Sequence, residues 1–231
     1  WYACIPHVLN VAGVIRGLCY RAKDKGGEQA LHRATPLVEF LLKCQDPTTG
    51  LLTEGWGDIP YKKTGLIHQT MATTALWEYF EVSGDNKIKR ATEKATNALP
   101  NCISWNVVNQ VLRFIETLIS RSKALAEPID LKLIHKWGKW ALNLQFREGE
   151  VKGAFPQSTS GEVIYSCYQG KCLAPLVKMW QICKDESYLK SAIRLAEFIE
   201  KHLIVITDSG PLLSCGLCPE GIYIPLWQKV Y

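Results

Sequence analysis

Residues 140–199 read WALNLQFREGEVKGAFPQSTSGEVIYSCYQGKCLAPLVKMWQICKDESYLKSAIRLAEFI. The segment begins in a helical pattern, passes through a loop rich in glycine and aromatic residues, and enters a second helical pattern at residue 164. A short turn at 184–186 leads into a third. Apolar residues recur at three- and four-residue spacing, which indicates helices with a buried face. The segment therefore predicts helical hairpins joined by loops of unequal length.

The same layout occurs 100 residues earlier, in the segment 40–95. Five positions agree at this one offset without gaps: Gln45 with Gln145, Gln69 with Gln169, Leu76 with Leu176, Phe80 with Trp180, and Asp85 with Asp185. Helix, loop and turn also fall in the same places. The pattern predicts an internal repeat of helical hairpins.

Helical patterns cover the chain at 7–20, 28–44, 65–82, 87–99, 105–122, 130–146, 164–182 and 187–203. The connections after the second and sixth are long and carry aromatic residues, whereas those after the third and seventh are short. This alternation predicts an all-α fold of four hairpins in two concentric layers, with the long loops gathered at the N-terminal ends of the inner helices. Loops on a rigid scaffold commonly carry function. The tail is expected to pack over the core or to form a short strand at 222–227.

The composition is that of an ordinary globular domain, 47% hydrophobic and 21% charged. No stretch resembles a linker, so we expect a single domain over 1–231, either whole or part of a longer chain. The net charge of +5 is spread along the sequence and forms no dense basic stripe, which argues against a nucleic-acid partner. No apolar run reaches the roughly 18–20 residues of a membrane span, so no membrane partner is expected.

The nine cysteines are unevenly spaced and fall mostly in apolar helical segments. This pattern favours buried thiols and a reducing compartment, hence the cytoplasm, although the native targeting is unknown. Cys215 and Cys218 form the only CxxC pair. Without a second pair or a nearby histidine, a zinc site is not expected, and a local disulfide is the alternative. We expect no metal and no cofactor.

One order of motifs resembles a known class. It runs Gly153-Ala-Phe-Pro-Gln157, Tyr165, Tyr168-Gln169, Asp185-Glu-Ser-Tyr-Leu189 and Ala192-Ile-Arg-Leu-Ala196. This order resembles the hairpin repeat of (α/α) toroid proteins, six-hairpin-glycosidase-like, that act on carbohydrates. The resemblance is clear over 130–203 and fainter over 28–98, and it implies that the glycine-aromatic loop lies at a sugar pocket. A full toroid has more hairpins than the four predicted here, so the chain is an incomplete ring, a fragment or an open solenoid. Remaining hairpins or a partner chain would complete a ring.

Two carboxylates share the long loop before the third helix. Glu54 and Asp58 stand there with Trp56 and Tyr61. Glycoside hydrolysis uses such a pair, one to protonate the leaving oxygen and one to activate water or attack the sugar, while aromatic rings pack on the sugar. The alternative is two solvated loop acids, with Trp56 in the core.

The first turns of the third and seventh helices carry a second set of polar groups. His68 and Gln69 lie in one, and Tyr165, Tyr168 and Gln169 lie in the other. Helix N-termini favour an anion such as a uronate carboxylate. With His68 as base and a tyrosine as acid, a uronate lyase or epimerase would remove the proton beside that carboxylate. The alternative for His68 is a structural role.

Further saccharide contacts are expected from Trp105 and Asn109 at the start of the fifth helix, and from Phe155 and Gln157 in the loop. Trp105 and Asn109 fit equally well as core and cap residues. The chain lacks phosphate-binding glycine loops, HExxH and GxSxG. We therefore expect a carbohydrate-active enzyme with a saccharide ligand, a glycoside hydrolase or a uronate lyase or epimerase. The rival is a non-catalytic helical-repeat scaffold that binds a protein or peptide on its concave face.

Overall fold

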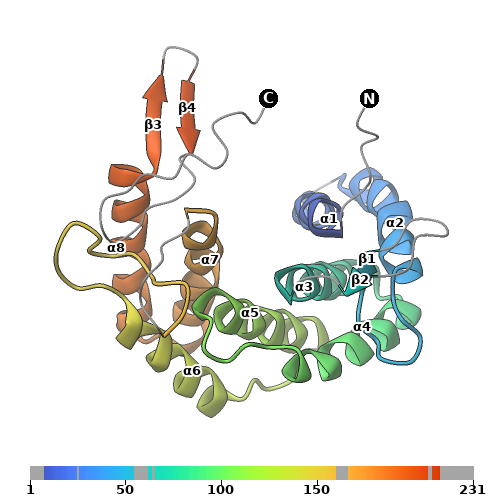
Figure 1. The fold of residues 1–231 in the computed structure, drawn as a ribbon. Coiled ribbons are helices and arrows are strands. Elements are labelled where there is room, and N and C mark those ends of the chain that lie inside the picture. The colour runs from blue at the N-terminus through green and yellow to red at the C-terminus, as the bar shows by residue number, and fades with distance from the viewer. Residues whose placement is uncertain are drawn as a thin grey trace. The chain divides into compact units, whose positions relative to one another are not determined.

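The computed structural model describes residues 8–24, 26–54, 62–63, 66–159, 166–207 and 210–213. Eight α-helices follow one another in this part of the chain: α1 (Val8–Ala22), α2 (Glu28–Lys43), α3 (Leu66–Ser83), α4 (Asn86–Ala98), α5 (Val108–Leu125), α6 (Leu131–Leu144), α7 (Ser166–Cys183) and α8 (Glu186–His202). One turn of 3₁₀ helix, η1 (Leu99–Asn101), follows α4. The predicted all-α hairpin fold is confirmed (Figure 1).

Two short antiparallel hairpins complete the described secondary structure. Strand β1 (Thr53–Glu54) pairs with β2 (Lys62–Lys63), and β3 (Ile204–Thr207) pairs with β4 (Gly210–Leu213). The second hairpin extends from the end of α8 (Figure 1). We did not predict it, although the β-branched run at β3 is a strand signal. The strand predicted at 222–227 lies outside the described residues.

Contacts divide the chain into two compact units. The first comprises Trp1–Ile103 and Thr117–Ile129, and the second comprises Ser104–Glu116 and Asp130–Tyr231. Helix α5 therefore contributes its first half to the second unit and its second half to the first. The single domain over 1–231 stays a prediction, and each unit is described by itself.

In the first unit, α3 is the inner helix that packs against α1, α2 and α4 (Figure 1). Nearly every residue from 69 to 79 is buried, so α3 has no solvent-facing side along this stretch. Helix α2 instead buries one stripe, formed by Ala30, Ala34, Val38 and Leu41. A stripe at this spacing is typical of a helix that covers a core from outside. The predicted inner and outer layers are thus present within this unit.

The second unit repeats the arrangement. All residues from 111 to 116, in the part of α5 that belongs to this unit, are buried, whereas α8 buries one face through Tyr188, Ala192 and Leu195. Gly138 brings α6 close to its neighbours, because a Cβ there would lie 2.7 Å from the Tyr188 hydroxyl. The inner and outer layers therefore appear in this unit as well.

The internal repeat is confirmed by helix positions and by caps. Helices α1, α3 and α4 begin at residues 8, 66 and 86, and α5, α7 and α8 begin 100 residues later. Asp85 caps α4 by accepting a hydrogen bond from the Lys87 N–H, and Asp185 caps α8 by accepting one from the Ser187 N–H. The first copy is therefore α1–α4 and the second is α5–α8.

Equivalent glutamines tie the long loops to the outer helices. Gln45 Nε2 donates to a loop carbonyl at 2.7 Å and to the Ala91 carbonyl of α4 at 2.9 Å. Gln145 Nε2 does the same with the loop carbonyl of Gly153 at 2.8 Å and with the Ser191 carbonyl of α8 at 3.0 Å. The agreement of Gln45 with Gln145 in the sequence thus reflects one structural role in both copies.

Each copy of the repeat contains an ion pair between two inner helices, and the acidic and basic residues exchange places between the copies. In the first copy Arg16 of α1 donates to both carboxylate oxygens of Glu78 on α3, at 2.9 and 3.0 Å. In the second copy Glu116 of α5 accepts from Lys178 of α7 at 2.9 Å. Positions 16 and 116, and 78 and 178, are equivalent by the repeat offset. The same contact between inner helices therefore uses an acid and a base in exchanged places.

Candidate functional site

The first turn of α3 carries His68, which is half-buried, and Gln69. Gln69 Oε1 accepts a hydrogen bond from the Leu52 N–H at 2.8 Å, and its Nε2 donates to the Leu52 carbonyl. The side chain is 3% exposed. Gln69 therefore fixes the backbone that leads into β1, two residues before Glu54.

The first turn of α7 repeats this arrangement with Tyr168 and Gln169. Gln169 bonds the Phe155 N–H and the Phe155 carbonyl, both at 2.8 Å. Gln169 and Phe155 are each 1% exposed. We predicted that Gln69, Gln169 and Phe155 contact a saccharide. The structure instead gives them a place in the scaffold that holds the loops, because the two carboxamides bond backbone and the Phe155 ring offers no open face.

His68 and Tyr168 occupy equivalent positions, each immediately before one of these glutamines. Gln69 and Gln169 each link a loop to the first turn of a helix. His68 and Tyr168 lie in those same first turns. Tyr168 is half-buried, and Lys171 Nζ lies 5.4 Å from the centre of its ring. His68 and Tyr168 belong to different units, so each is described within its own unit.

The loop that contains Gln157 lies beside the start of α5. The Gln157 carbonyl accepts from the Val108 N–H at 3.0 Å, and the Asn106 carbonyl accepts from the Thr159 N–H at 3.0 Å. Because Gln169 holds the same loop through Phe155, this loop joins the first turns of α5 and α7. The second unit therefore brings the predicted residues at both helix starts to one loop.

The Trp105 ring is part of an aromatic cluster in the second unit. Its ring stacks on Trp137 with centroids 4.5 Å apart and an interplanar angle of 26°. Phe114 meets it edge-on at 5.7 Å, and Trp140 meets Trp137 edge-on at 5.8 Å. One ring face of Trp105 is thus used in packing, which supports the core role that we left open for it. Its half-buried position leaves part of the side chain accessible.

Asn109 has an unusual environment in the first turn of α5. The side chain is 2% exposed, and neither its nitrogen nor its oxygen hydrogen-bonds to a described residue. Buried polar atoms usually have partners, and leaving one without costs about 1–3 kcal/mol. A carboxamide offers both a donor and an acceptor, which suits a sugar hydroxyl or an ordered water. This is the strongest mark of a ligand-facing position among the described predicted residues.

Several predicted residues are not described in full. Glu54 lies in β1 opposite Lys62, which establishes its backbone but not its side chain. The other predicted residues that lie outside the described residues are Trp56, Asp58, Tyr61 and Tyr165. The pair of catalytic carboxylates therefore stays a prediction.

The cysteines whose side chains are described, at positions 19, 44, 102, 172 and 183, are free thiols. Burial raises the pKa of Cys19 and of Cys172 to about 12, so these thiols stay protonated and weakly nucleophilic at neutral pH. In the described residues, no group of three or more histidine, cysteine or acidic side chains could hold a metal, and no helix is long and apolar enough to cross a bilayer. Cys215 and Cys218 lie outside the described residues.

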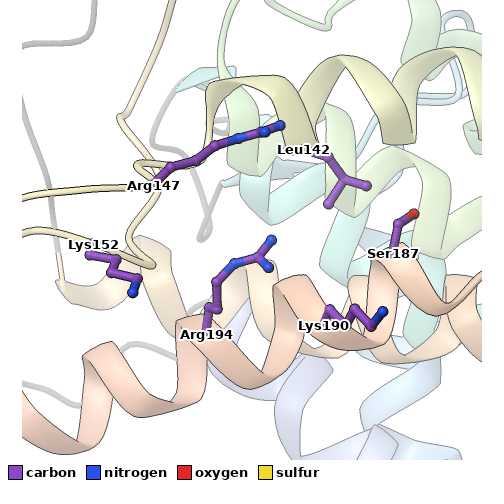
Figure 2. A pocket seen from close by; sticks show the side chains of 6 residues that line it. All are labelled: Leu142, Arg147, Lys152, Ser187, Lys190 and Arg194. Carbon is purple, nitrogen blue, oxygen red and sulfur yellow. The ribbon is translucent and has the colours of Figure 1, made fainter.

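The described part of the chain contains a pocket that the sequence did not predict. It has a volume of about 440 Å³ and is lined by Leu142, Arg147, Lys152, Ser187, Lys190 and Arg194 (Figure 2). The available signal was the i, i+4 spacing of Lys190 and Arg194 on α8. That signal is weak, since basic residues at this spacing are common on solvated helix faces.

No protein-family model and no curated protein matches the chain. Solved structures do match it. Cellobiose 2-epimerase from Bacillus thermoamylovorans superposes with a TM-score of 0.70 and 13% identity, covering 95% of this chain and 66% of that one. D-mannose isomerase gives 0.69 and 14%, covering 95% and 65%. An α-1,6-mannanase of Salegentibacter sp. gives 0.63 and 11%, covering 94% and 58%.

The chain spans less than two thirds of the length of these structures. At such low identities the similarity establishes the fold. It agrees with the resemblance noted in residues 130–203, since these proteins are (α/α) toroid enzymes. The chain has the fold of (α/α) toroid enzymes, without assignment to one family.

Proposed function

We propose that this chain acts on a saccharide as an epimerase or isomerase, at the carbon beside the carbonyl group of a reducing sugar. The observation that carries the proposal is the buried Asn109 carboxamide at the start of α5, beside the loop that joins α5 to α7. The fold supports the reaction class, because similar structures include a sugar epimerase, a cellobiose 2-epimerase and a D-mannose isomerase.

Such a reaction needs a group that removes a proton and a group that donates one. A base takes the proton from the carbon beside the carbonyl, and the electron pair forms an enediol. Return of a proton to the opposite face of that carbon gives the epimer, and return to the former carbonyl carbon gives the ketose. A neutral imidazole nitrogen can accept a proton, so His68 of the first unit is the proposed base. Tyr168, which we predicted as the acid, belongs to the second unit, and its role stays a prediction.

The test is proton exchange in D2O. The chain is incubated with cellobiose, glucose or mannose, and the sugars are followed by NMR and mass spectrometry. We expect one deuterium at C2 of the epimer, or one at C1 of the ketose. His68→Gln should abolish the exchange, whereas His32→Gln, at an exposed site on α2, should leave it unchanged. Asn109→Ala should raise KM about tenfold with a smaller change in kcat, because its carboxamide is proposed to bind a hydroxyl.

Unchanged sugars, without deuterium uptake or chemical-shift changes in the folded protein, would overturn the proposal. That result would favour the non-catalytic scaffold. A parallel incubation with a uronate oligosaccharide that gave an unsaturated cleavage product would instead indicate the lyase reaction.

A second candidate is a glycoside hydrolase that uses Glu54 and Asp58. The similarity to the α-1,6-mannanase favours it, and that enzyme was solved with α-1,6-mannotriose. Incubation of the present chain with this trisaccharide in H2¹⁸O would show ¹⁸O at the new reducing end if water attacks. Glu54→Gln and Asp58→Asn should then each abolish cleavage. Cleavage without exchange at C2 would select the hydrolase over the epimerase.

A further inference from the structure

The pocket between α6 and α8 has a one-sided charge. Figure 2 shows Arg147 and Lys152 on the loop after α6, facing α8, which supplies Ser187, Lys190 and Arg194. Four of the six lining residues are basic and none is acidic. Among the described residues, none of those predicted for the saccharide site lines it, so it needs an explanation of its own.

The four cations have no anionic partner in the part of the chain that the structure describes. None of them forms an ion pair there. Elsewhere, exposed cations do find carboxylates, as Lys123 finds Glu81 at 3.1 Å. Like charges four residues apart on a helix repel, as Lys190 and Arg194 do. Grouping these charges around one hollow therefore costs stability unless an anion is bound.

The guanidinium of Arg194 is held in place by hydrogen bonds to Gln145. Its Nε and Nη2 donate to Gln145 Oε1 at 3.2 and 2.9 Å, and Gln145 is 3% exposed. A guanidinium has five N–H donors, so three remain after these two bonds. Its planar fork matches two oxygens of a phosphate group, and holding it in advance lowers the entropy lost on binding.

In the first copy of the repeat, the basic residues at the equivalent positions of the outer helix have a carboxylate nearby. Its equivalents of Lys190 and Arg194 are Arg90 and Lys94, and its loop contains an acid, Asp46. Hydrogen bonds from the loop N–H groups, and then the charge of Lys94, hold the pKa of Asp46 below its ordinary value. The position equivalent to Asp46 in the second copy is Phe146. The second copy therefore keeps the cations and has no carboxylate at the position of Asp46. Its loop does contain Glu148 and Glu150, but neither lines the pocket or forms an ion pair with the four cations in the described part of the chain.

We propose that this pocket binds the phosphate group of a small phosphorylated molecule. Arg194 would take two phosphate oxygens, while Arg147, Lys152 and Lys190 would supply positive charge around it. The volume of about 440 Å³ lies within the range of small-molecule sites. The site is separate from the proposed saccharide reaction, so either proposal can fail while the other stands.

Calorimetric titration of the full chain tests the site with pyrophosphate, inorganic phosphate, glucose 6-phosphate and glucose. We expect one equivalent of glucose 6-phosphate or pyrophosphate to bind, more weakly as salt rises, and glucose not to bind at this site. The double variant Arg147→Gln/Lys190→Gln should bind at least about tenfold more weakly. Both side chains are exposed and donate no hydrogen bond to a described residue, so the variant should keep the wild-type Tm.

The control is Lys87→Gln/Arg90→Gln, which removes the same charge from α4 and includes Arg90, the equivalent of Lys190. It should change the affinity by less than about twofold, because long-range charge effects are screened by salt. Equal weakening by both double variants would show a general charge effect and overturn the proposal. Absence of binding by every phosphorylated probe would also overturn it, as would equal binding of glucose and glucose 6-phosphate. Preference for glucose 6-phosphate over inorganic phosphate would show that the site also contacts the sugar.

Discussion

Gln169 holds the backbone of Phe155 through both ends of one carboxamide, and Gln69 holds Leu52 in the same way. A glutamine in the first turn of an inner helix could equally have faced a ligand. The structural role follows from the hydrogen-bonding groups of the loop backbone. A buried loop residue has one N–H and one carbonyl to satisfy, and a carboxamide supplies the complementary acceptor and donor.

Replacing Gln169 with leucine should therefore lower the free energy of unfolding by about 2–4 kcal/mol, because two buried backbone groups lose their partners. Urea unfolding followed by circular dichroism measures the change. Gln110→Leu is the control, since Gln110 accepts one exposed bond from the Ser104 N–H and should cost less than about 1 kcal/mol. Equal costs for the two variants would contradict the role assigned to Gln169.

At the scale of elements, the inner helices are joined by buried ion pairs of opposite polarity in the two copies. Glu116 is fully buried and accepts from both Arg113 and Lys178. An ion pair of this kind need not be more stable than apolar residues of the same size, but losing one member is costly. The reversed polarity shows that position 16 or 116 need only complement position 78 or 178.

Glu116→Gln should lower the free energy of unfolding by about 3–5 kcal/mol, because two cations then face a neutral group in a buried place. Adding Lys178→Met should restore part of the loss, which a double-mutant cycle in urea would show. The exposed pair Arg121–Glu127 is the control, and Glu127→Gln should cost less than about 1 kcal/mol. Additive effects of the two changes would mean that Glu116 and Lys178 do not interact.

At the scale of the whole molecule, stability depends on groups spread through both units. Hydrogen bonds from Ser187 lower the pKa of Asp185, and those from loop N–H groups lower the pKa of Asp46. Burial raises the pKa of Glu81, but hydrogen bonds from Lys23 and Lys123 outweigh it and hold that pKa below 4.5. The hydrogen bond to Glu81 raises the pKa of Lys123 above 10.5.

These shifts predict a broad stability maximum. The carboxylates stabilise the fold above their ordinary values of 3.8 and 4.5, and this contribution is lost as the pH falls through their lower folded pKa values. Lys123 stabilises below 10.5, and its contribution is lost as the pH rises through its higher folded pKa. Urea unfolding from pH 2 to 11 should show both losses. Glu81→Gln should weaken both limbs, and an unchanged profile would contradict the assignment.

Local patterns were sufficient to predict the helices, the repeat offset and the two layers. The apolar stripe of α2 and the caps Asp85 and Asp185 can each be recognised from residues that are close together in the sequence. The candidate site was harder. Gln69, Gln169 and Phe155 have the composition of a binding loop, and only their long-range hydrogen bonds reveal a structural role. By sequence, Asn109 fits a core or cap residue and a saccharide contact equally well. Its burial without a hydrogen-bond partner among the described residues is what distinguishes it.

Helical periodicity, caps and turns act over short distances, so they were enough to predict the eight helices of the described part of the chain and their two copies. Tertiary structure alone decided which chemistry the polar side chains are free to perform. It placed Arg194 on Gln145, gathered four cations around one pocket, and divided α5 between two compact units. These features join residues about 40 or more positions apart, and their pairing depends on how the helices pack. Local sequence patterns contain no information at that distance.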